Sequence, residues 1–213
     1  MRATIIKDNA KDIKKTTRIL IKSLKKGDII LTRPNKLDTI KLITINIWSF
    51  LISKVGRGVT HSCFYLGNGY VIESGRRITD KKIQKISLEK LLRDRFSIFK
   101  GVTVYIVQPK IYNEKHRKIA LEFAVNKFLK KTENIAFSYI EVIKVGLRYI
   151  FHKSEFYKDE NLDKKKKWNC STMIAHIIKK SGAHIGKRNA NTFLPDSFLF
   201  SKHFKTKKKF ILK

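Results

Sequence analysis

A predicted β-hairpin at residues 60–75, THSCFYLGNGYVIESG, constrains the fold of this 213-residue chain more than any other feature. Two runs rich in β-branched and aromatic residues, 61–66 and 70–74, flank the tripeptide Gly67-Asn68-Gly69. Such runs are typical of strands, and glycine and asparagine accept the backbone angles that a tight turn requires. We therefore expect two antiparallel strands joined by this turn.

The hairpin carries candidate functional groups, because side chains alternate across a strand and every second residue shares a face. His61, Cys63 and Tyr65 are expected on one face. A tight hairpin lays the second strand beside the first, so that Glu73 can reach the imidazole of His61. The pair would supply a general base and a carboxylate that orients it.

A candidate nucleophile lies about a hundred residues downstream, in the segment 168–182, WNCSTMIAHIIKKSG. Its apolar residues recur at i, i+3, i+4, i+7 and i+8 from Cys170, which predicts a core-packed helix that stops near Gly182. Cys170 would then lie in the first turn, where unpaired backbone N–H groups and the helix dipole favour a thiolate. A nearby imidazolium would favour the thiolate further.

These residues resemble a known family. The hairpin is similar to the histidine strand and the following strand of the NlpC-type papain-like superfamily. The order histidine, acid, cysteine is the reverse of papain, and resembles the circularly permuted branch that includes YiiX-like cysteine peptidases and the lecithin:retinol acyltransferase group. From Gly27 onward, three further segments look like family elements: an opening strand (27–31), the segment after the hairpin (86–89) and a proline-aspartate turn (194–197).

The resemblance implies an α+β papain-like fold of the circularly permuted NlpC type, with a small antiparallel barrel or curved sheet and the nucleophile helix packed against it. It implies a thiol hydrolase that cleaves an amide bond in a peptide or cell-wall-type peptide. The catalytic residues would be Cys170, His61 and Glu73, without a cofactor. The chain departs from the family at 136–139, AFSY, where relatives often carry Tyr-Asp-Tyr, so a role for that aspartate does not carry over.

Two other functions fit the sequence. Relatives that act on membranes, together with the apolar segment 40–52, suggest an acyltransferase or lipid-ester hydrolase; the segment itself is expected to be a buried core helix, too short to span a bilayer. The net charge of +31, from 48 basic and 17 acidic residues, instead suggests a non-catalytic protein that binds a polyanion or anionic lipid. No specific nucleic-acid motif is present, and the basic residues are scattered along the chain.

The cysteines also bear on metal binding and compartment. A metal site built from His61, Cys63 and Cys170 is conceivable, but their spacing matches no paired-ligand pattern, and we expect no metal. Cys63 is expected to point toward the Cys170 helix and fill space there. Two cysteines do not form a disulfide scaffold, which suits a reducing compartment. With no signal peptide or transmembrane segment recognised, a cytoplasmic, host-cell or viral location is expected.

The chain divides into three expected parts. Residues 1–26 form a basic lead-in helix, 27–201 the permuted papain-like domain, and 202–213 a basic tail that is either a last strand or a surface-binding extension. The charge-dense segment 152–167 is expected to be a loop beside the Cys170 helix that could gate the site.

Overall fold

A computed structural model of the chain describes residues 3–6, 12–35, 58–74, 83–99, 101–130, 136–137, 162, 167–186, 190 and 193–212. The predictions for the apolar segment 40–52 and for nearly all of the segment 152–167 lie outside the described residues. No helix among the residues described is both long and apolar enough to cross a membrane.

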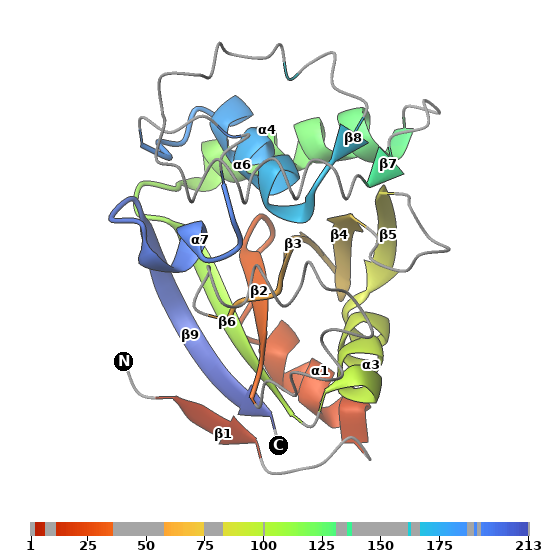
Figure 1. Cartoon of the computed structure of the whole chain (residues 1–213). Helices are drawn as coiled ribbons and strands as arrows, with labels where there is room; N and C mark the ends of the chain where they lie inside the picture. The colour runs from red at the N-terminus through yellow and green to blue at the C-terminus, as the bar shows by residue number, and fades with distance from the viewer. Residues whose placement is uncertain are drawn as a thin grey trace.

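The protein is built around a seven-stranded mixed sheet in the order β1-β9-β6-β2-β3-β4-β5 (Figure 1). The strands are β1 (Thr4–Ile6), β2 (Ile29–Pro34), β3 (His61–Gly67), β4 (Tyr70–Ser74), β5 (Ile83–Ser87), β6 (Val102–Pro109) and β9 (Phe204–Leu212). All neighbours are antiparallel except β1 and β9. The α+β class is confirmed. The barrel alternative is wrong, because β1 and β5 remain two separate edges of an open sheet.

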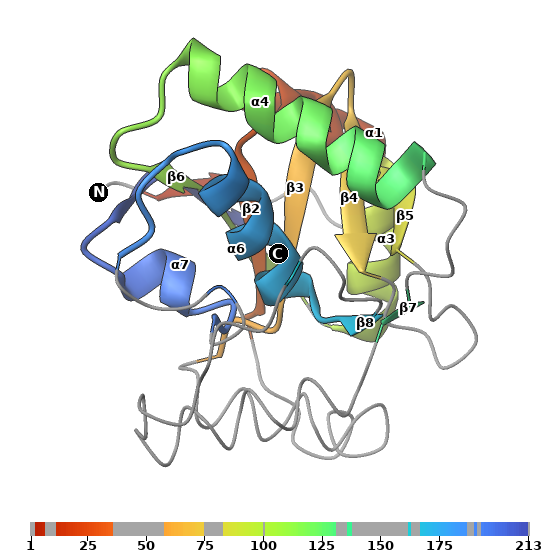
Figure 2. The ribbon, with the colours of Figure 1, turned by 90° about the horizontal axis from the view of Figure 1, so that it is seen from above.

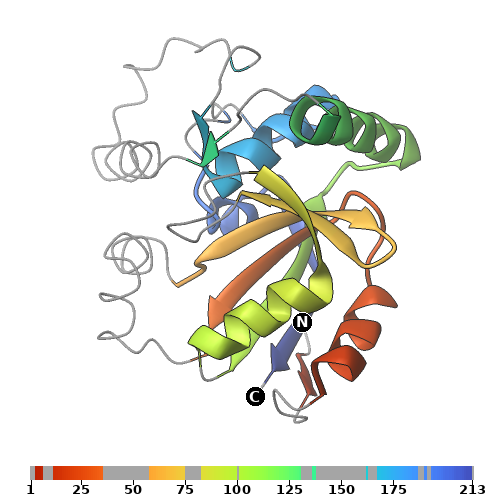
Figure 3. The same ribbon diagram turned by 90° about the vertical axis from the view of Figure 1, so that its right-hand side faces the viewer.

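Helices cover both faces of this sheet, as Figure 3 shows. One face carries α4 (Glu114–Val125), which continues as the π-helix η2 (Asn126–Lys130), together with α6 (Cys170–Lys180) and the short α7 (Ser197–Phe200). The other face carries α1 (Ile13–Ile21) and α3 (Leu88–Ile98). Each face has its own apolar cluster. A separate parallel pair, β7 (Ala136–Phe137) and β8 (Lys167–Trp168), precedes α6.

The predicted hairpin is confirmed as β3 and β4, with Phe64 opposite Ile72 and Tyr65 opposite Val71. Asn68 is the one non-glycine residue with a positive φ, 52°, among those described, and Gly69 follows it with φ 76°. Glycine and asparagine are the residues that tolerate this region, so the turn sequence explains the turn geometry.

Both ends of the described chain belong to the sheet. The segment predicted as a lead-in helix contains a strand, β1, before α1. The basic tail, for which two interpretations were open, is strand β9, which lies between β1 and β6. Its apolar residues Phe204, Phe210 and Leu212 are buried and its lysines are partly or fully exposed, which is the alternation of a half-covered strand.

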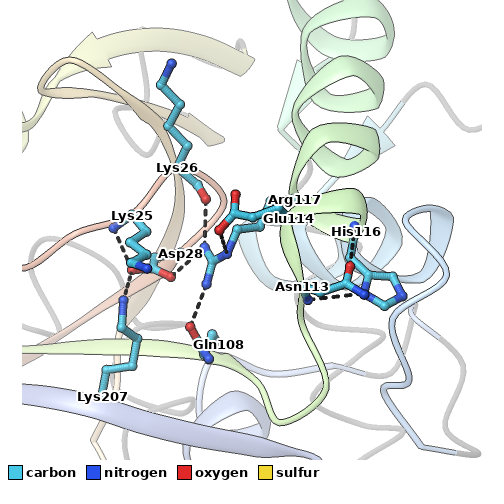
Figure 4. Close-up of polar contacts among 9 residues, drawn as sticks. All are labelled: Lys25, Lys26, Asp28, Gln108, Asn113, Glu114, His116, Arg117 and Lys207. Atoms are coloured by element: carbon cyan, nitrogen blue, oxygen red, sulfur yellow. Dashed lines mark hydrogen bonds and ion pairs between the residues drawn. The ribbon is translucent and has the colours of Figure 1, made fainter.

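A buried ion pair ties the opening of β2 to the first turn of α4 (Figure 4). Arg117 donates hydrogen bonds to Asp28 (2.9 Å), to the carbonyl oxygen of Lys26 (2.7 Å) and to Gln108 (2.6 Å). Lys207 of β9 donates to the other oxygen of Asp28 at 2.6 Å. The side chain of Asp28 is fully buried and that of Arg117 is 5% exposed, so β2, α4 and β9 converge on one carboxylate that water does not reach.

We expect the substitution Arg117→Met to lower the free energy of unfolding by about 3–5 kcal/mol, because it removes one of the two cations that pair with the buried carboxylate of Asp28 and the donor to the Lys26 carbonyl and Gln108. The matched control is Arg93→Met, which breaks the exposed ion pair with Glu89 and should cost less than about 1 kcal/mol. Urea unfolding followed by circular dichroism measures both. Equal costs for the two variants would contradict the structural role of Arg117.

Candidate functional site

The candidate base and its carboxylate partner are in direct contact. Nε2 of His61, the first residue of β3, lies 2.9 Å from Oε2 of Glu73 in β4. Their side chains are only 2% and 8% exposed. The hydrogen bond engages Nε2, which leaves Nδ1 as the ring nitrogen that can exchange a proton with another group. The structure thus joins these two predicted site residues across the hairpin.

The predicted nucleophile is the first residue of α6. Asn169 is the N-cap, and its side-chain oxygen accepts a hydrogen bond from the backbone N–H of Thr172 at 2.7 Å. Helix geometry leaves the N–H groups of Cys170 and Ser171 without a carbonyl partner inside the helix. Cys170 is partly exposed, whereas every residue from Ser171 to Ile178 is buried. Cys170 therefore lies at the partly exposed N-terminal end of a helix whose middle is buried.

One hydrogen bond holds the segment before α6 against the hairpin, over which the helix packs (Figure 2), and two more hold the neighbouring turn at residues 193–196. Ser74, beside Glu73, donates to the carbonyl oxygen of Trp168 at 3.4 Å. Ser171 donates to the carbonyl oxygen of Phe193 at 2.6 Å. In the turn after Phe193, Asp196 accepts from the N–H of Val59, two residues before His61, at 3.3 Å. The turn at residues 193–196 thus contacts both the first turn of α6 and the chain just before His61.

The electrostatic surroundings make Cys170 acidic. Burial alone would raise the pKa of its thiol, but hydrogen bonding to His61 and the charge of His61, followed by hydrogen bonding to Ser62, lower that pKa to about 6. The hydroxyl of Ser62 has no nitrogen or oxygen partner among the described residues, and so remains available to the sulfur. A thiol with a pKa near 6 is mostly thiolate at neutral pH.

Glu73 stays ionised in spite of its burial. Burial acts to raise the pKa of its carboxyl, but hydrogen bonding to His61, the charges of His61 and Arg95, and a hydrogen bond from Gln84 lower it below its ordinary value. The amide of Gln84 in β5 lies 3.3 Å from Oε1, the oxygen that His61 does not use. Both carboxylate oxygens therefore have donors, so the carboxylate is held in one orientation.

The prediction that Cys63 points toward the Cys170 helix is wrong. Cys63 is fully buried in the apolar cluster on the opposite face of the sheet, with residues of α1 and α3. Burial raises the pKa of its thiol well above the ordinary value. Tyr65, which was expected on the same face as Cys63, packs in the same cluster and is part of the core. His61 nevertheless acts on Cys170, because it is the first residue of β3, at the end of the strand, where groups from the two faces of the sheet can approach each other.

Other polar residues do not extend the site. His176 is buried between the rings of Trp168 and Phe123, with centroids 5.2 Å from each. His116 caps α4. Among the described residues, no three His, Cys, Asp or Glu side chains come close enough together to hold a metal ion. The segment 136–139, where the chain departs from the family pattern, is described only for β7.

Sequence reasoning missed Asn169, Ser62 and Gln84. Asn169 could have been found, because asparagine directly before an apolar-periodic run is a standard helix cap. Ser62 and Gln84 carry no such local signal. Their roles depend on which strands are neighbours, and Gln84 lies opposite Glu73 only because β5 pairs with β4.

We expect iodoacetamide to modify Cys170 roughly 100-fold faster than Cys63 at pH 7, because alkylation requires a thiolate and only Cys170 has one at that pH. The rate at Cys170 should rise as the pH increases through about 6 and then level off, since its pKa lies there. Mass spectrometry of the modified peptides measures both sites. A Cys170 rate that rises only near pH 9 would contradict the described geometry.

Comparisons with known proteins do not add to this picture. None of the protein-family models matches the chain, and a search of curated proteins finds no significant match. The chemistry of Cys170, His61 and Glu73 therefore has to support any functional proposal by itself.

Proposed function

We propose that this protein is a cysteine hydrolase that cleaves amide bonds in a peptide or acyl-amide substrate. The observation that carries the proposal is the acidic thiol of Cys170, whose pKa is lowered to about 6 chiefly by His61. A buried structural cysteine has no such surroundings, as the raised pKa of Cys63 in the same molecule illustrates. A thiolate beside an imidazole that a carboxylate orients is the arrangement used for nucleophilic attack on a carbonyl.

In the proposed reaction, the thiolate of Cys170 attacks the carbonyl carbon of the scissile amide and forms a carbon–sulfur bond. The carbon–nitrogen bond then breaks, and the imidazolium of His61 transfers its proton to the leaving amine. Neutral His61 next takes a proton from water, whose oxygen attacks the thioester. The acid product leaves and the thiolate returns. Glu73 keeps the imidazole oriented and stabilises its cationic form.

Stabilisation of the tetrahedral oxyanion would come from the start of α6. The backbone N–H groups of Cys170 and Ser171 have no intrahelical acceptor, and the positive end of the helix dipole points in the same direction. Donors fixed in place before the reaction stabilise the developing negative charge without having to reorganise. The buried body of α6 keeps its first turn rigid.

The circularly permuted papain-like relationship is part of the same proposal. The order of His61, Glu73 and Cys170 along the chain and the packing of α6 on the hairpin strands support it. The acyltransferase and lipid-ester alternatives drew on the apolar segment 40–52, which lies outside the described residues.

The test compares wild type, Cys170→Ala and Cys63→Ala on pools of peptides, muropeptides and phospholipids. Wild type and Cys63→Ala should release new amines from an amide-containing pool, and Cys170→Ala should lose at least about 100-fold in rate because the nucleophile is gone. A thioester on Cys170, trapped at low pH and weighed by mass spectrometry, would support the mechanism. Full activity in Cys170→Ala, or release of fatty acids only, would contradict it.

A further inference from the structure

Helix α3 presents an unexpected residue to the core. Its buried stripe consists of Leu88, Leu91, Leu92 and Arg95, at positions i, i+3, i+4 and i+7. The three leucines are at most 1% exposed and Arg95 is 5% exposed. The fourth position of such a stripe normally carries an apolar side chain, because it faces the same core as the other three. Arginine therefore stands where leucine would suffice for packing.

A buried guanidinium needs a counter-charge, since an isolated charge in the protein interior is costly. Three carboxylates among the described residues are buried: Asp28, Glu73 and Asp196. Asp28 is occupied by Arg117 and Lys207. Asp196 accepts from Val59 in the turn before α7, on the opposite face of the sheet.

Glu73 is the remaining buried carboxylate among the three, and it lies on the face of the sheet that α3 covers. Its strand neighbour Val71 and the facing residue Cys63 both belong to the cluster that contains Leu91 and Leu92 of α3. Alternation along β4 directs residues 71 and 73 to the same side, so the side chain of Glu73 points into the layer that α3 covers. The stripe of α3 and the register of β4 thus bring the buried cation and the buried carboxylate to one layer.

We propose that Arg95 is a positioning residue that holds Glu73 as a carboxylate from behind, so that Glu73 can orient His61 and thereby sustain the thiolate of Cys170. The site would then be a relay of four groups that crosses the sheet, from α3 through β4 and β3 to α6. The inference rests on the site of the proposed function but not on which bond that site cleaves.

The groups that act on Glu73 from the surrounding described elements agree with this role. His61 and Cys63 come from β3, Arg95 from α3 and the neutral amide of Gln84 from β5. Arg95 lowers the pKa of Glu73, after His61, and it also lowers the pKa of Cys63. Of these groups, Arg95 alone keeps its charge at every accessible pH, because a guanidinium does not lose its proton in proteins.

Removal of Arg95 should raise the pKa of Cys170 whether or not Glu73 stays ionised. If Glu73 becomes protonated, it no longer stabilises the imidazolium of His61, and the thiolate of Cys170 then loses the positive charge that stabilises it. If Glu73 stays ionised, the surroundings of the sulfur become more negative. We therefore expect Arg95→Met, which keeps an unbranched side chain, to move the midpoint of Cys170 alkylation up by about 0.5–1 pH unit.

The pH profile of iodoacetamide modification is measured for wild type, Arg95→Met, Arg95→Lys and the exposed control Arg93→Met from the same helix. Arg95→Lys should restore most of the wild-type midpoint because it keeps the charge, and Arg93→Met should match wild type. A midpoint in Arg95→Met within about 0.2 pH unit of wild type, which is roughly the resolution of such profiles, would overturn the proposal.

A second measurement does not depend on the thiol. Glu73→Gln alone leaves Arg95 without its counter-charge, so it should unfold at a lower urea concentration than the double variant Glu73→Gln/Arg95→Met, in which no charge is stranded. Additive effects of the two substitutions would overturn the pairing. A wild type that cleaves no amide while the alkylation midpoint still moves would count against the proposed function and support the role of Arg95.

Discussion

The hydrogen bond between Nε2 of His61 and Oε2 of Glu73 is the contact on which the proposed chemistry depends. It fixes which ring nitrogen is left for the thiol, and it requires a carboxylate to stay charged in a place that water barely reaches. The protein meets that requirement with Gln84 on the second oxygen and with the positive charges of His61 and Arg95. The hairpin makes the contact local, because a single tight turn brings the two residues together.

The third group of the candidate site, the thiol of Cys170, lies far from the other two in the sequence. Its placement depends on how α6 packs on the sheet. Cys170 meets His61 because α6 packs on β3 and β4, and because hydrogen bonds from Ser74 and Ser171 hold the chain on either side of Cys170. Asp28 and Arg117 have a comparable role at the opposite end of strands β2 and β3, where they join β2 and α4. A buried carboxylate with cationic partners occurs in both places. At Asp28 every partner is structural, whereas at Glu73 one partner is an imidazole that can exchange protons.

Sequence reasoning succeeded where the signal was local. The glycine-asparagine-glycine turn predicted the hairpin, and the spacing of apolar residues predicted α6 with Cys170 in its first turn. It failed where the answer depends on pairing between distant segments. Nothing near residues 202–213 says that they pair with both β1 and β6, so the open sheet and the internal position of β9 could not be foreseen.

The error over Cys63 has a different physical origin. Alternation correctly grouped Cys63 with Tyr65, but the inference that their shared face is the one that α6 covers was wrong. The helix packs on the other face and meets His61 only at the end of the strand. Arg95 is the complementary case: its spacing from the leucines of α3 accounts for its burial, but the proposed role beside Glu73 could be inferred only from the fold.

The net charge of +31 and the acidity of Cys170 are separate properties. Two unit charges 20 Å apart in water interact by only about 0.2 kcal/mol before salt weakens the interaction further, so distant lysines contribute little to the pKa of one thiol. The two cysteines illustrate this. They share one molecule and one net charge, yet the pKa of Cys63 is raised and that of Cys170 is lowered. Local burial and the neighbouring His61 therefore set the pKa of each thiol, and the net charge of the chain does not.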